Sequence, residues 1–384
     1  NLMEIKDTLN LPVTDFPMKA SLTQREPEML ACWEKDELYK KIRQSAKGKP
    51  KYVFHDGPPY ANGHIHMGHA LNKLLKDFIV KIMSMRGFDA GFIPGWDCHG
   101  LPIEHQVGKK LKEKKLSLEK PEIRKQCRIY AQEFVDIQKE EFKRLGVLAD
   151  WDNPYLTMNY SYEATIVREF GKFVEKGLVY KGMKPVHWCT SCQTALAEAE
   201  VEHTDHTSPS IYVKFPVQSG TPKTMTGLNQ LSMVIWTTTP WTLPANLAVC
   251  LHPDFVYVAV SYGDETFIVA EDRLSSLVAE WKLKDFKIVA SCKGAEWKDA
   301  ICIHPFIDRD SKVILGDHVT LEQGTGCVHT APGHGHDDYI VGLKYGLDPY
   351  NPVNSAGVFV PEVEYFGGMF VRKANPEIIE KLKQ

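Results

Sequence analysis

The chain has 384 residues, of which 43% are hydrophobic and 25% are charged, and its formal net charge is −3. This length exceeds what one hydrophobic core usually supports, so we expect two or more domains of an ordinary globular protein. The composition excludes a basic field over the whole molecule, so an RNA partner would need a local patch, and no apolar run approaches the roughly 20 residues that span a bilayer.

The chain opens with a predicted arm, a helix and a strand. The arm extends to about Ala20. Thr23 and Glu26 have the spacing of a capping box, which predicts a helix that continues to about Arg43. Lys51–Gly57 then predicts a short buried strand.

A helix and a second strand follow. His66–Arg86 predicts a helix because apolar residues recur at helical spacing and Gly87 ends the pattern. Phe88–Ile93 predicts the second strand. Strand, helix and strand form a βαβ unit, which favours a parallel sheet with a right-handed crossover. The recurring apolar residues of the helix are Leu71, Leu75, Phe78, Ile79 and Ile82.

The rest of the chain divides near Tyr180. Pro121–Leu145 and a segment of about Tyr162–Lys176 predict two further helices. After Tyr180, short β-branched runs alternate with Gly, Pro and Asp turns, which predicts a mostly β, barrel-like domain. The expected boundaries are 1–180 for the arm and nucleotide-binding part, 181–200 for a connecting segment and 201–384 for the β domain.

The loop HDGPPYANGHIHMGH, His55–His69, is the first candidate site. His66 and His69 are three residues apart on the first helical turn, so both can face one phosphate chain, and Gly68 leaves room for a base or ribose. Imidazoles can donate hydrogen bonds to phosphate oxygens as charge builds in a transition state. The alternative is a set of histidines with structural roles in a Gly/Pro turn, and the strand before and helix after the loop favour the nucleotide site.

The segment PGWDCHGLPIE, Pro94–Glu104, lies at the end of the second predicted strand. Asp97 could there receive the ammonium group of a ligand. A plain Asx-turn after Gly95 is an equally good interpretation of this residue alone.

Two segments of the β domain form the second candidate site. Val234–Ala248 contains three consecutive threonines, and Gly324–Tyr339 contains three histidines and paired aspartates. Hydroxyl groups can position a water or bind a sugar, and a carboxylate can anchor an amine. The alternatives are an edge strand for the threonines and a metal-binding turn for the second segment.

Two weaker signals remain. Cys189 and Cys192 have zinc-knuckle spacing, but zinc prefers four ligands and one pair is visible, so redox chemistry and ordinary thiols stay open. The nine scattered cysteines favour a reducing, cytoplasmic setting. The run KKLKEKK, Lys109–Lys115, could contact tRNA phosphates or form a solvated helix face.

The loop His55–His69 and the segment Pro94–Glu104 resemble the corresponding motifs of class I aminoacyl-tRNA synthetases, and within that class those of the isoleucyl-tRNA synthetases. HMGH matches the class signature of two histidines around an apolar residue and glycine. GPPYANG with WDCHGLPIE favours the isoleucine group over the valyl and leucyl relatives. The resemblance implies ATP binding by His66, Gly68 and His69, with the two histidines stabilising the reacting phosphate.

The resemblance also implies an amino-acid site and a reaction. Gly57 and Pro58 would line the aliphatic pocket, and Asp97 would hold the α-amino group. The isoleucine carboxylate would attack the α-phosphate of ATP, pyrophosphate would leave, and isoleucine would pass to the 3′ end of tRNA. Mg²⁺ would be needed for the phosphate charge.

The β domain resembles the editing domain inserted into these synthetases. His329 and Asp338 would shape its amino-acid site, with Asp338 binding the ammonium of a misattached residue. Valine lacks one methylene of isoleucine, and burying one methylene is worth only about 1–3 kcal/mol of discrimination, a magnitude known from this same pair of amino acids. A second site must therefore hydrolyse valyl-tRNA. The residues implied to bind the tRNA terminus and position water are Thr237, Thr238, Thr239 and Asn246.

The expected fold class is therefore α/β, with the first half of a Rossmann-like parallel-sheet domain and an inserted, mostly β, barrel-like editing domain. The expected partners are isoleucine, ATP with Mg²⁺ and tRNA(Ile), and Zn²⁺ is expected if further ligands exist. We expect a cytoplasmic monomer without membrane contact. The chain contains no KMSKS-type loop or anticodon-binding domain, so we expect a truncated form that activates isoleucine poorly on its own. Alternatives are a free-standing deacylase of mischarged tRNA and a zinc-bearing RNA-binding module.

Overall fold

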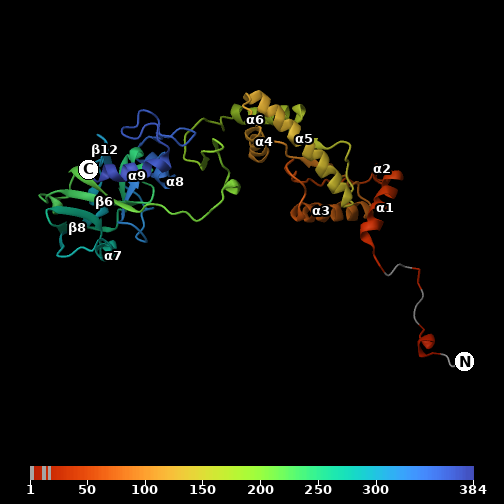
Figure 1. The fold of residues 1–384 in the computed structure, drawn as a ribbon, viewed down its shortest axis with the longest axis horizontal. Coiled ribbons are helices and arrows are strands. Elements are labelled where there is room, and N and C mark those ends of the chain that lie inside the picture. Colours follow the sequence, from red (N-terminus) through yellow and green to blue (C-terminus); the bar gives the residue numbers. More distant parts are fainter. Residues whose placement is uncertain (1–3, 11–13, 16–18) are drawn as a thin grey trace. The chain divides into compact units, whose positions relative to one another are not determined.

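The computed structural model describes residues 4–10, 14–15 and 19–384 (Figure 1). The parts of the expected arm numbered 1–3, 11–13 and 16–18 lie outside these described residues. The chain divides into two compact units, Asn1–Tyr180 and Lys181–Gln384, which we call unit 1 and unit 2. Each described helix is too short or too polar to cross a bilayer.

Unit 1 begins with short helices, and the prediction of one helix to Arg43 was wrong. A 3-10 turn, η1 (Ile5–Thr8), precedes α1 (Leu22–Lys35) and α2 (Leu38–Ser45). The predicted capping box does not form, because Ser21 is the N-cap residue and no side chain caps α1. The chain breaks at Glu37, whose φ is 50°, and the break lets Arg43 of α2 pair with the buried Asp89.

The parallel pairing predicted for unit 1 is present but short. The expected strands around Lys51 and Asp89 are reduced to one parallel bridge between these two residues, and a second parallel bridge joins Tyr60 to Asp97. Strands β1 (Gly95–Trp96) and β2 (Tyr155–Leu156) add a short parallel pair. Prolines at positions 50, 58, 59 and 94 cannot donate a ladder hydrogen bond, which limits these strands.

Four helices pack around this pairing. They are α3 (Met67–Met85), α4 (Leu101–Glu113), α5 (Lys120–Arg144) and α6 (Tyr160–Glu175). The predictions of α3, α5 and α6 are confirmed to within two residues, and α4 was anticipated only in part, as a solvated helix face at Lys109–Lys115. The helices bury Trp96, Ile103, Val135 and Phe142 in one cluster of the unit 1 core.

The helix α3 turns its apolar stripe outward. Leu71, Leu75 and Ile82 keep 62%, 52% and 54% of their surface exposed. The residues that α3 buries are instead Lys73, Asp77 and Val80.

Unit 2 is built on a mixed sheet. Within the described residues the sheet has nine strands in the order β10-β8-β9-β6-β5-β11-β12-β7-β13. The pairs β6–β9 and β12–β7 are parallel and the other pairs are antiparallel. The strands are β5 (Ile211–Ser219), β6 (Leu231–Thr237), β7 (Ala248–Leu251), β8 (Val256–Tyr262), β9 (Glu265–Ala270), β10 (Lys287–Lys293), β11 (Ile301–Ile303), β12 (Asp310–Leu315) and β13 (Cys327–Thr330).

Helices and short turns surround the sheet. The helices, which the sequence interpretation did not place, are α7 (Glu271–Trp281), α8 (His336–Lys344) and α9 (Val371–Leu382). The 3-10 turns are η2 (Glu198–Glu200), η3 (Lys223–Met225), η4 (Pro240–Ala245) and η5 (Gly294–Trp297), and a separate hairpin consists of β3 (Trp188–Cys189) and β4 (Thr194–Ala195). The central strand β6 is almost wholly buried, and its side chains join the main core of this unit.

Candidate functional site

The first candidate site is built at the start of α3. His66 is the N-cap residue, with an extended backbone (φ −125°, ψ 175°). Its Nδ1 accepts a hydrogen bond from the Gly68 backbone N–H (3.1 Å), and His69 Nδ1 accepts from the His66 backbone N–H (3.3 Å). The two rings lie together, with centroids 3.9 Å apart.

This reciprocal capping fixes the tautomer of both histidines. A neutral imidazole that accepts at Nδ1 carries its proton on Nε2. Burial lowers the pKa of His69, and the neighbouring His66 and Lys73 lower it further, so this ring is neutral at neutral pH. Two Nε2–H donors therefore lie beside the positive end of a long helix, an arrangement suited to an anion such as phosphate.

Gly68 is required by His66 itself. A Cβ at position 68 would come within 2.9 Å of the His66 ring. A larger residue would therefore displace the ring that caps the helix.

A buried ion-pair cluster holds the beginning of the loop. Asp56 is 1% exposed and pairs with both Lys73 and Lys76 of α3. The Tyr155 hydroxyl donates to the Asp56 carbonyl at 3.0 Å. Burial lowers the pKa of Lys73, and its bond to Asp56 opposes this effect. The sequence interpretation missed this cluster, although the Lys73–Lys76 spacing of three residues places both amines on one helix face.

Asp97 lies beside the loop, as the parallel pattern predicts. Its backbone N–H donates to the Pro59 carbonyl (2.8 Å), and its carbonyl accepts from Ala61 N–H (2.8 Å). Its carboxylate accepts from His99 N–H at 3.3 Å, so the Asx-turn considered from the sequence is also formed. Gly57 is exposed, and a Cβ there would meet no atom within 4 Å, so the space above it is open.

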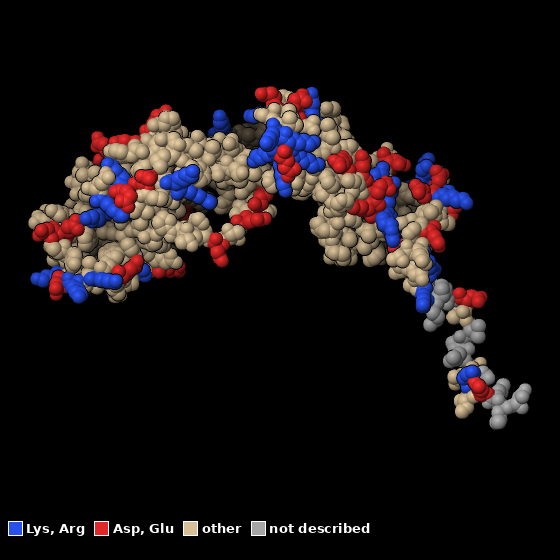
Figure 2. Space-filling model, in the orientation of Figure 1, with Lys and Arg blue, Asp and Glu red and all other residues tan. Residues whose placement is uncertain are grey.

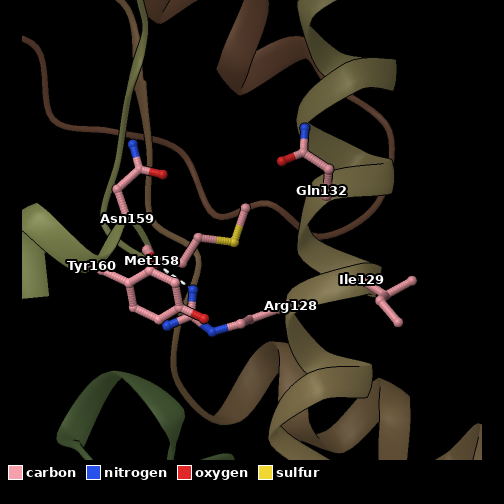
Figure 3. A pocket seen from close by; sticks show the side chains of 6 residues that line it. All are labelled: Arg128, Ile129, Gln132, Met158, Asn159 and Tyr160. Carbon is pink, nitrogen blue, oxygen red and sulfur yellow. Dashed lines mark hydrogen bonds between the residues drawn. The ribbon is translucent and has the colours of Figure 1, made fainter.

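A shallow pocket of about 290 Å³ also lies in unit 1 (Figure 3). The Arg128 guanidinium crosses it, stacks on Tyr160 at 4.6 Å, and donates to the Met158 carbonyl and Glu163. It contains none of the predicted site residues. The lining residues are Arg128, Ile129, Gln132, Met158, Asn159 and Tyr160.

Lysines gather at the C-terminal end of α4. Figure 2 shows basic side chains over this helix. All five lysines are exposed, and Lys110 lies over the Tyr130 ring at 4.5 Å. They are Lys109, Lys110, Lys112, Lys114 and Lys115.

The second candidate site lies in unit 2, where β6 ends. Thr237 is 7% exposed, and its hydroxyl accepts from Thr239 N–H at 3.0 Å. Thr238 is half-buried and Thr239 is exposed, so these two residues are more accessible than Thr237. The Thr239 carbonyl accepts from the Thr242 hydroxyl (2.9 Å) at the first turn of η4.

A buried network joins this turn to β13. His329 Nε2 lies 2.9 Å from the Thr242 hydroxyl, and His329 Nδ1 lies 2.8 Å from Asn246 Nδ2. Because an amide nitrogen can only donate, Nδ1 accepts and Nε2–H donates to Thr242. Burial chiefly lowers the pKa of His329 to about 3, so the ring is neutral. Asn246 is 0% exposed, and Ser311 and the Ala248 carbonyl complete its bonding.

Asp338 lies near this network on the first turn of α8. Its Oδ2 accepts from the Ala331 N–H (2.8 Å), two residues beyond His329. Burial raises the pKa of Asp338, and this hydrogen bond opposes the rise. His334 Nε2 is buried with no hydrogen-bond partner among the described residues, and burial lowers the pKa of His334 to about 4.

The predicted cysteine pair forms the turn of the β3–β4 hairpin. The Cys192 N–H donates to Cys189 Sγ at 3.3 Å, and this bond lowers the pKa of the Cys189 thiol. No group of three or more His, Cys, Asp or Glu side chains is placed to hold a metal ion in the part of the chain that the structure describes. Two ligands alone do not fit a structural zinc site.

Comparisons with known proteins identify the family of the chain. A family model described as tRNA synthetases class I (I, L, M and V) matches residues 28–357. The chain belongs to the class I tRNA synthetases. Its structure adds that this synthetase portion is mixed α/β and contains a large mixed sheet.

Two bacterial relatives of this synthetase chain are named isoleucine–tRNA ligase. The protein of Geobacter sulfurreducens is 58% identical over 385 residues, covering all of this chain and 42% of that protein. The protein of Syntrophotalea carbinolica is 56% identical over 384 residues and is covered to 41%. The chain thus spans about two fifths of the length of these relatives. A crystal structure described as GlLeuRS-CP1 is more distant, with 15% identity, a TM-score of 0.38, and coverage of 46% of this chain and 96% of that one.

Proposed function

We propose that unit 1 activates isoleucine with ATP and that unit 2 hydrolyses valine wrongly attached to tRNA, as parts of an isoleucine–tRNA ligase. The observation that carries the proposal is the pair of capped imidazoles at the start of α3. All of this chain aligns, at 58% identity, with 42% of a protein named isoleucine–tRNA ligase. We further propose that unit 1 is the first half of a Rossmann-like domain and that unit 2, after a connecting segment at 181–200, is a barrel-like editing domain.

Activation uses the imidazole donors and the carboxylate acceptor of the first site, which are His66, His69 and Asp97. A carboxylate oxygen of isoleucine attacks the α-phosphorus of ATP, the bond to the bridging oxygen breaks, and pyrophosphate leaves. His66 and His69 donate Nε2–H bonds to phosphate oxygens as negative charge builds, with Gly68 giving the capping ring its place. Asp97 accepts from the ammonium group, while Gly57 and Pro58 face the aliphatic side chain. Mg²⁺, when bound, would neutralise phosphate charge, and we assign no protein ligand to it.

Editing uses the accessible hydroxyls of the second site. We assign Thr238 and Thr239 to the tRNA terminus and the attacking water, and Asp338 to the ammonium of the misattached valine. Water adds to the ester carbonyl, and the products are valine and tRNA with a free terminal hydroxyl. Thr237, Asn246 and His329 act through the network that holds this turn, since Thr237 and Asn246 are buried and paired. The activation pocket of unit 1 cannot exclude valine, because valine is smaller than isoleucine. The editing site must therefore be too small for isoleucine, so that it cleaves only the valyl ester.

The lysines of α4 are the basic group that we assign to tRNA phosphates. The exposed position of these lysines at and just beyond the last turn of α4 also suits the negative end of the helix dipole. A phosphate contact makes tRNA binding fall with salt, and charge reversal at Lys112 and Lys114 would reduce that slope.

Zinc binding by the cysteine pair is a separate proposal. Cys189 and Cys192 supply one half of a site, and two further ligands from elsewhere would be needed. No step of the reaction depends on this pair.

The test is amino-acid-dependent exchange of pyrophosphate into ATP by the natural protein that contains this chain. We expect isoleucine to support exchange more efficiently than valine or leucine. Preference for valine or leucine would contradict the substrate assignment. A protein that hydrolyses valyl-tRNA without any exchange would instead be the free-standing deacylase.

Editing is tested separately by hydrolysis of valyl-tRNA and isoleucyl-tRNA. The valyl ester should be cleaved, and the isoleucyl ester should persist. Asp338→Ala should abolish the cleavage because the ammonium loses its partner, whereas an unchanged rate would remove Asp338 from the site.

A further inference from the structure

One face of α5 contacts the loop His55–His69 at several positions along the helix. The Tyr130 hydroxyl donates to Asn62 Oδ1 at 2.8 Å. One turn further on, the Phe134 ring meets His64 edge-on, with centroids 6.3 Å apart. These positions recur at helical spacing, so α5 presents a continuous surface to the loop.

The centre of this face is Gln138, which is completely buried. Its Nε2 donates to the Tyr60 carbonyl (3.1 Å) and the Gly63 carbonyl (2.8 Å). Its Oε1 accepts from the Trp96 indole N–H at 2.9 Å. One amide thus satisfies two loop carbonyls and the residue immediately before Asp97.

The next turn of α5 also contacts the loop, through Glu141. Glu141 accepts from the Ile65 N–H (2.9 Å) and lies 2.5 Å from His64 Nδ1. These residues directly precede His66. Burial would raise the pKa of Glu141, but the bonds from Ile65 and His64 outweigh it and lower the pKa, so the carboxylate is charged.

The Gln138 contacts bridge the two halves of the first site. Tyr60 pairs with Asp97 in the parallel bridge, and Gly63 leads into the capped histidines. A helix that holds both segments sets the distance between the ATP donors and the amino-acid acceptor. Such spacing decides whether a carboxylate reaches phosphorus in a productive geometry.

We propose that Gln138 is a positioning residue that fixes Asp97 relative to the His66–His69 pair. The inference rests on the proposed activation of isoleucine in unit 1. It differs from a purely structural role because it requires that the loss of Gln138 slow the reaction in a protein that is still folded.

The experiment compares Gln138→Met with Gln132→Met in the natural protein that contains this chain. Methionine keeps the length of glutamine but forms no amide hydrogen bonds. Gln132 is on the same helix, is exposed, and, among the described residues, donates its side-chain hydrogen bond only to Asp136 of the same helix. Isoleucine-dependent exchange, valyl-tRNA hydrolysis and amide hydrogen exchange are measured for both variants.

Gln138→Met should lower kcat for exchange by about 10–100-fold, with a smaller change in KM, and leave hydrolysis in unit 2 unchanged. Amide exchange should quicken at residues 60–66 and not across the rest of unit 1. Gln132→Met should match the wild type in all three measurements.

Equal exchange rates in the two variants would overturn the proposal, as would a general quickening of amide exchange throughout unit 1. If the wild-type protein shows no exchange with isoleucine, the proposed function fails instead. The local amide measurement then still decides whether Gln138 positions the loop. A third variant, Gln138→Glu, retains an acceptor for Trp96 but cannot donate to both loop carbonyls, since a carboxyl group has at most one O–H donor. Wild-type exchange and amide protection in this variant would show that the two bonds to the loop carbonyls are not required.

Discussion

At the scale of single residues, His66 combines a structural and a chemical role in one ring. Its Nδ1 caps α3, and its Nε2 is the donor assigned to phosphate. Asparagine can cap a helix but cannot place a donor where Nε2 lies, and alanine can do neither.

His66→Ala should therefore destabilise the chain by about 1 kcal/mol through loss of the cap, and His66→Asn should not. Both variants should reduce isoleucine-dependent exchange by about 10²–10³-fold, since each removes a donor to the developing charge. Thermal unfolding and exchange of the natural protein check the two effects. Full activity in His66→Asn would show that capping alone explains this histidine.

The candidate residues of the first site could be found from the sequence, whereas their supports could not. Two histidines after a strand and before a helix predict an anion site, and a parallel crossover predicts Asp97 beside it. Gln138 and Glu141 are 75 or more residues away along the chain, and the pattern of α5 shows only that they share a helix face. A contact of this separation depends on tertiary packing, which local spacing does not encode.

At the scale of elements, helical periodicity predicted α3 correctly but did not show which way the helix faces. An apolar stripe usually marks the buried side. Here Leu75 and Phe78 are 52% and 54% exposed. Lys73 and Asp77 are buried instead, because Lys73 pairs with Asp56 and Asp77 pairs with Lys81.

Leu75→Gln with Phe78→Gln should change the free energy of unfolding of this chain by no more than about 0.5 kcal/mol. The same change should lower the fluorescence of a bound hydrophobic dye, because an exposed apolar patch is removed. Val80→Ala on the opposite face should cost about 1–3 kcal/mol. A large destabilisation by the glutamine pair would mean that the stripe is covered.

Short strands were the least predictable elements. In the nine-stranded sheet of unit 2, the runs SIYVKFPV, SMVIWTTT, FVYVAVSY, TFIVA, DFKIVA and KVILGDHVT overlap β5, β6, β8, β9, β10 and β12, but β7, β11 and β13 were missed. Each missed strand has three or four residues, which is too few to show alternation. In unit 1 the predicted strands contain or adjoin prolines, so apolar composition alone overstated them.

At the scale of the whole molecule, unit 2 holds two buried histidines and one half-buried histidine in neutral form, and this couples its stability to pH. Burial lowers the pKa of His329 to about 3 and the pKa values of His304 and His334 to about 4. An unfolded histidine titrates near about 6.5. Below that pH the unfolded chain binds protons that the folded unit excludes, so stability is present above about 6.5 and falls as pH drops toward about 4.

The Tm of unit 2 should therefore fall steadily between pH 7 and pH 5, with each histidine contributing up to about 1.4 kcal/mol per pH unit. His334→Phe should flatten the profile, since the ring keeps its packing on Trp241 and loses its titration. His203→Phe is the matched control, because His203 is exposed. An unchanged profile in His334→Phe would contradict the burial of a neutral ring there.

Because unit 1 is assigned to activation and unit 2 to hydrolysis, the presence of both in one chain gives a joint test. Valine that unit 1 activates and the protein transfers to tRNA should be released again by unit 2, and each round consumes ATP. The decisive measurement is the steady-state consumption of ATP by the natural protein with valine and tRNA(Ile). We predict that this consumption requires both valine and tRNA(Ile). His66→Asn should reduce it by about 10²–10³-fold, and in Asp338→Ala it should stop as valyl-tRNA accumulates. Consumption that needs neither tRNA nor valine, or that survives both substitutions, would contradict the assignment of the two units.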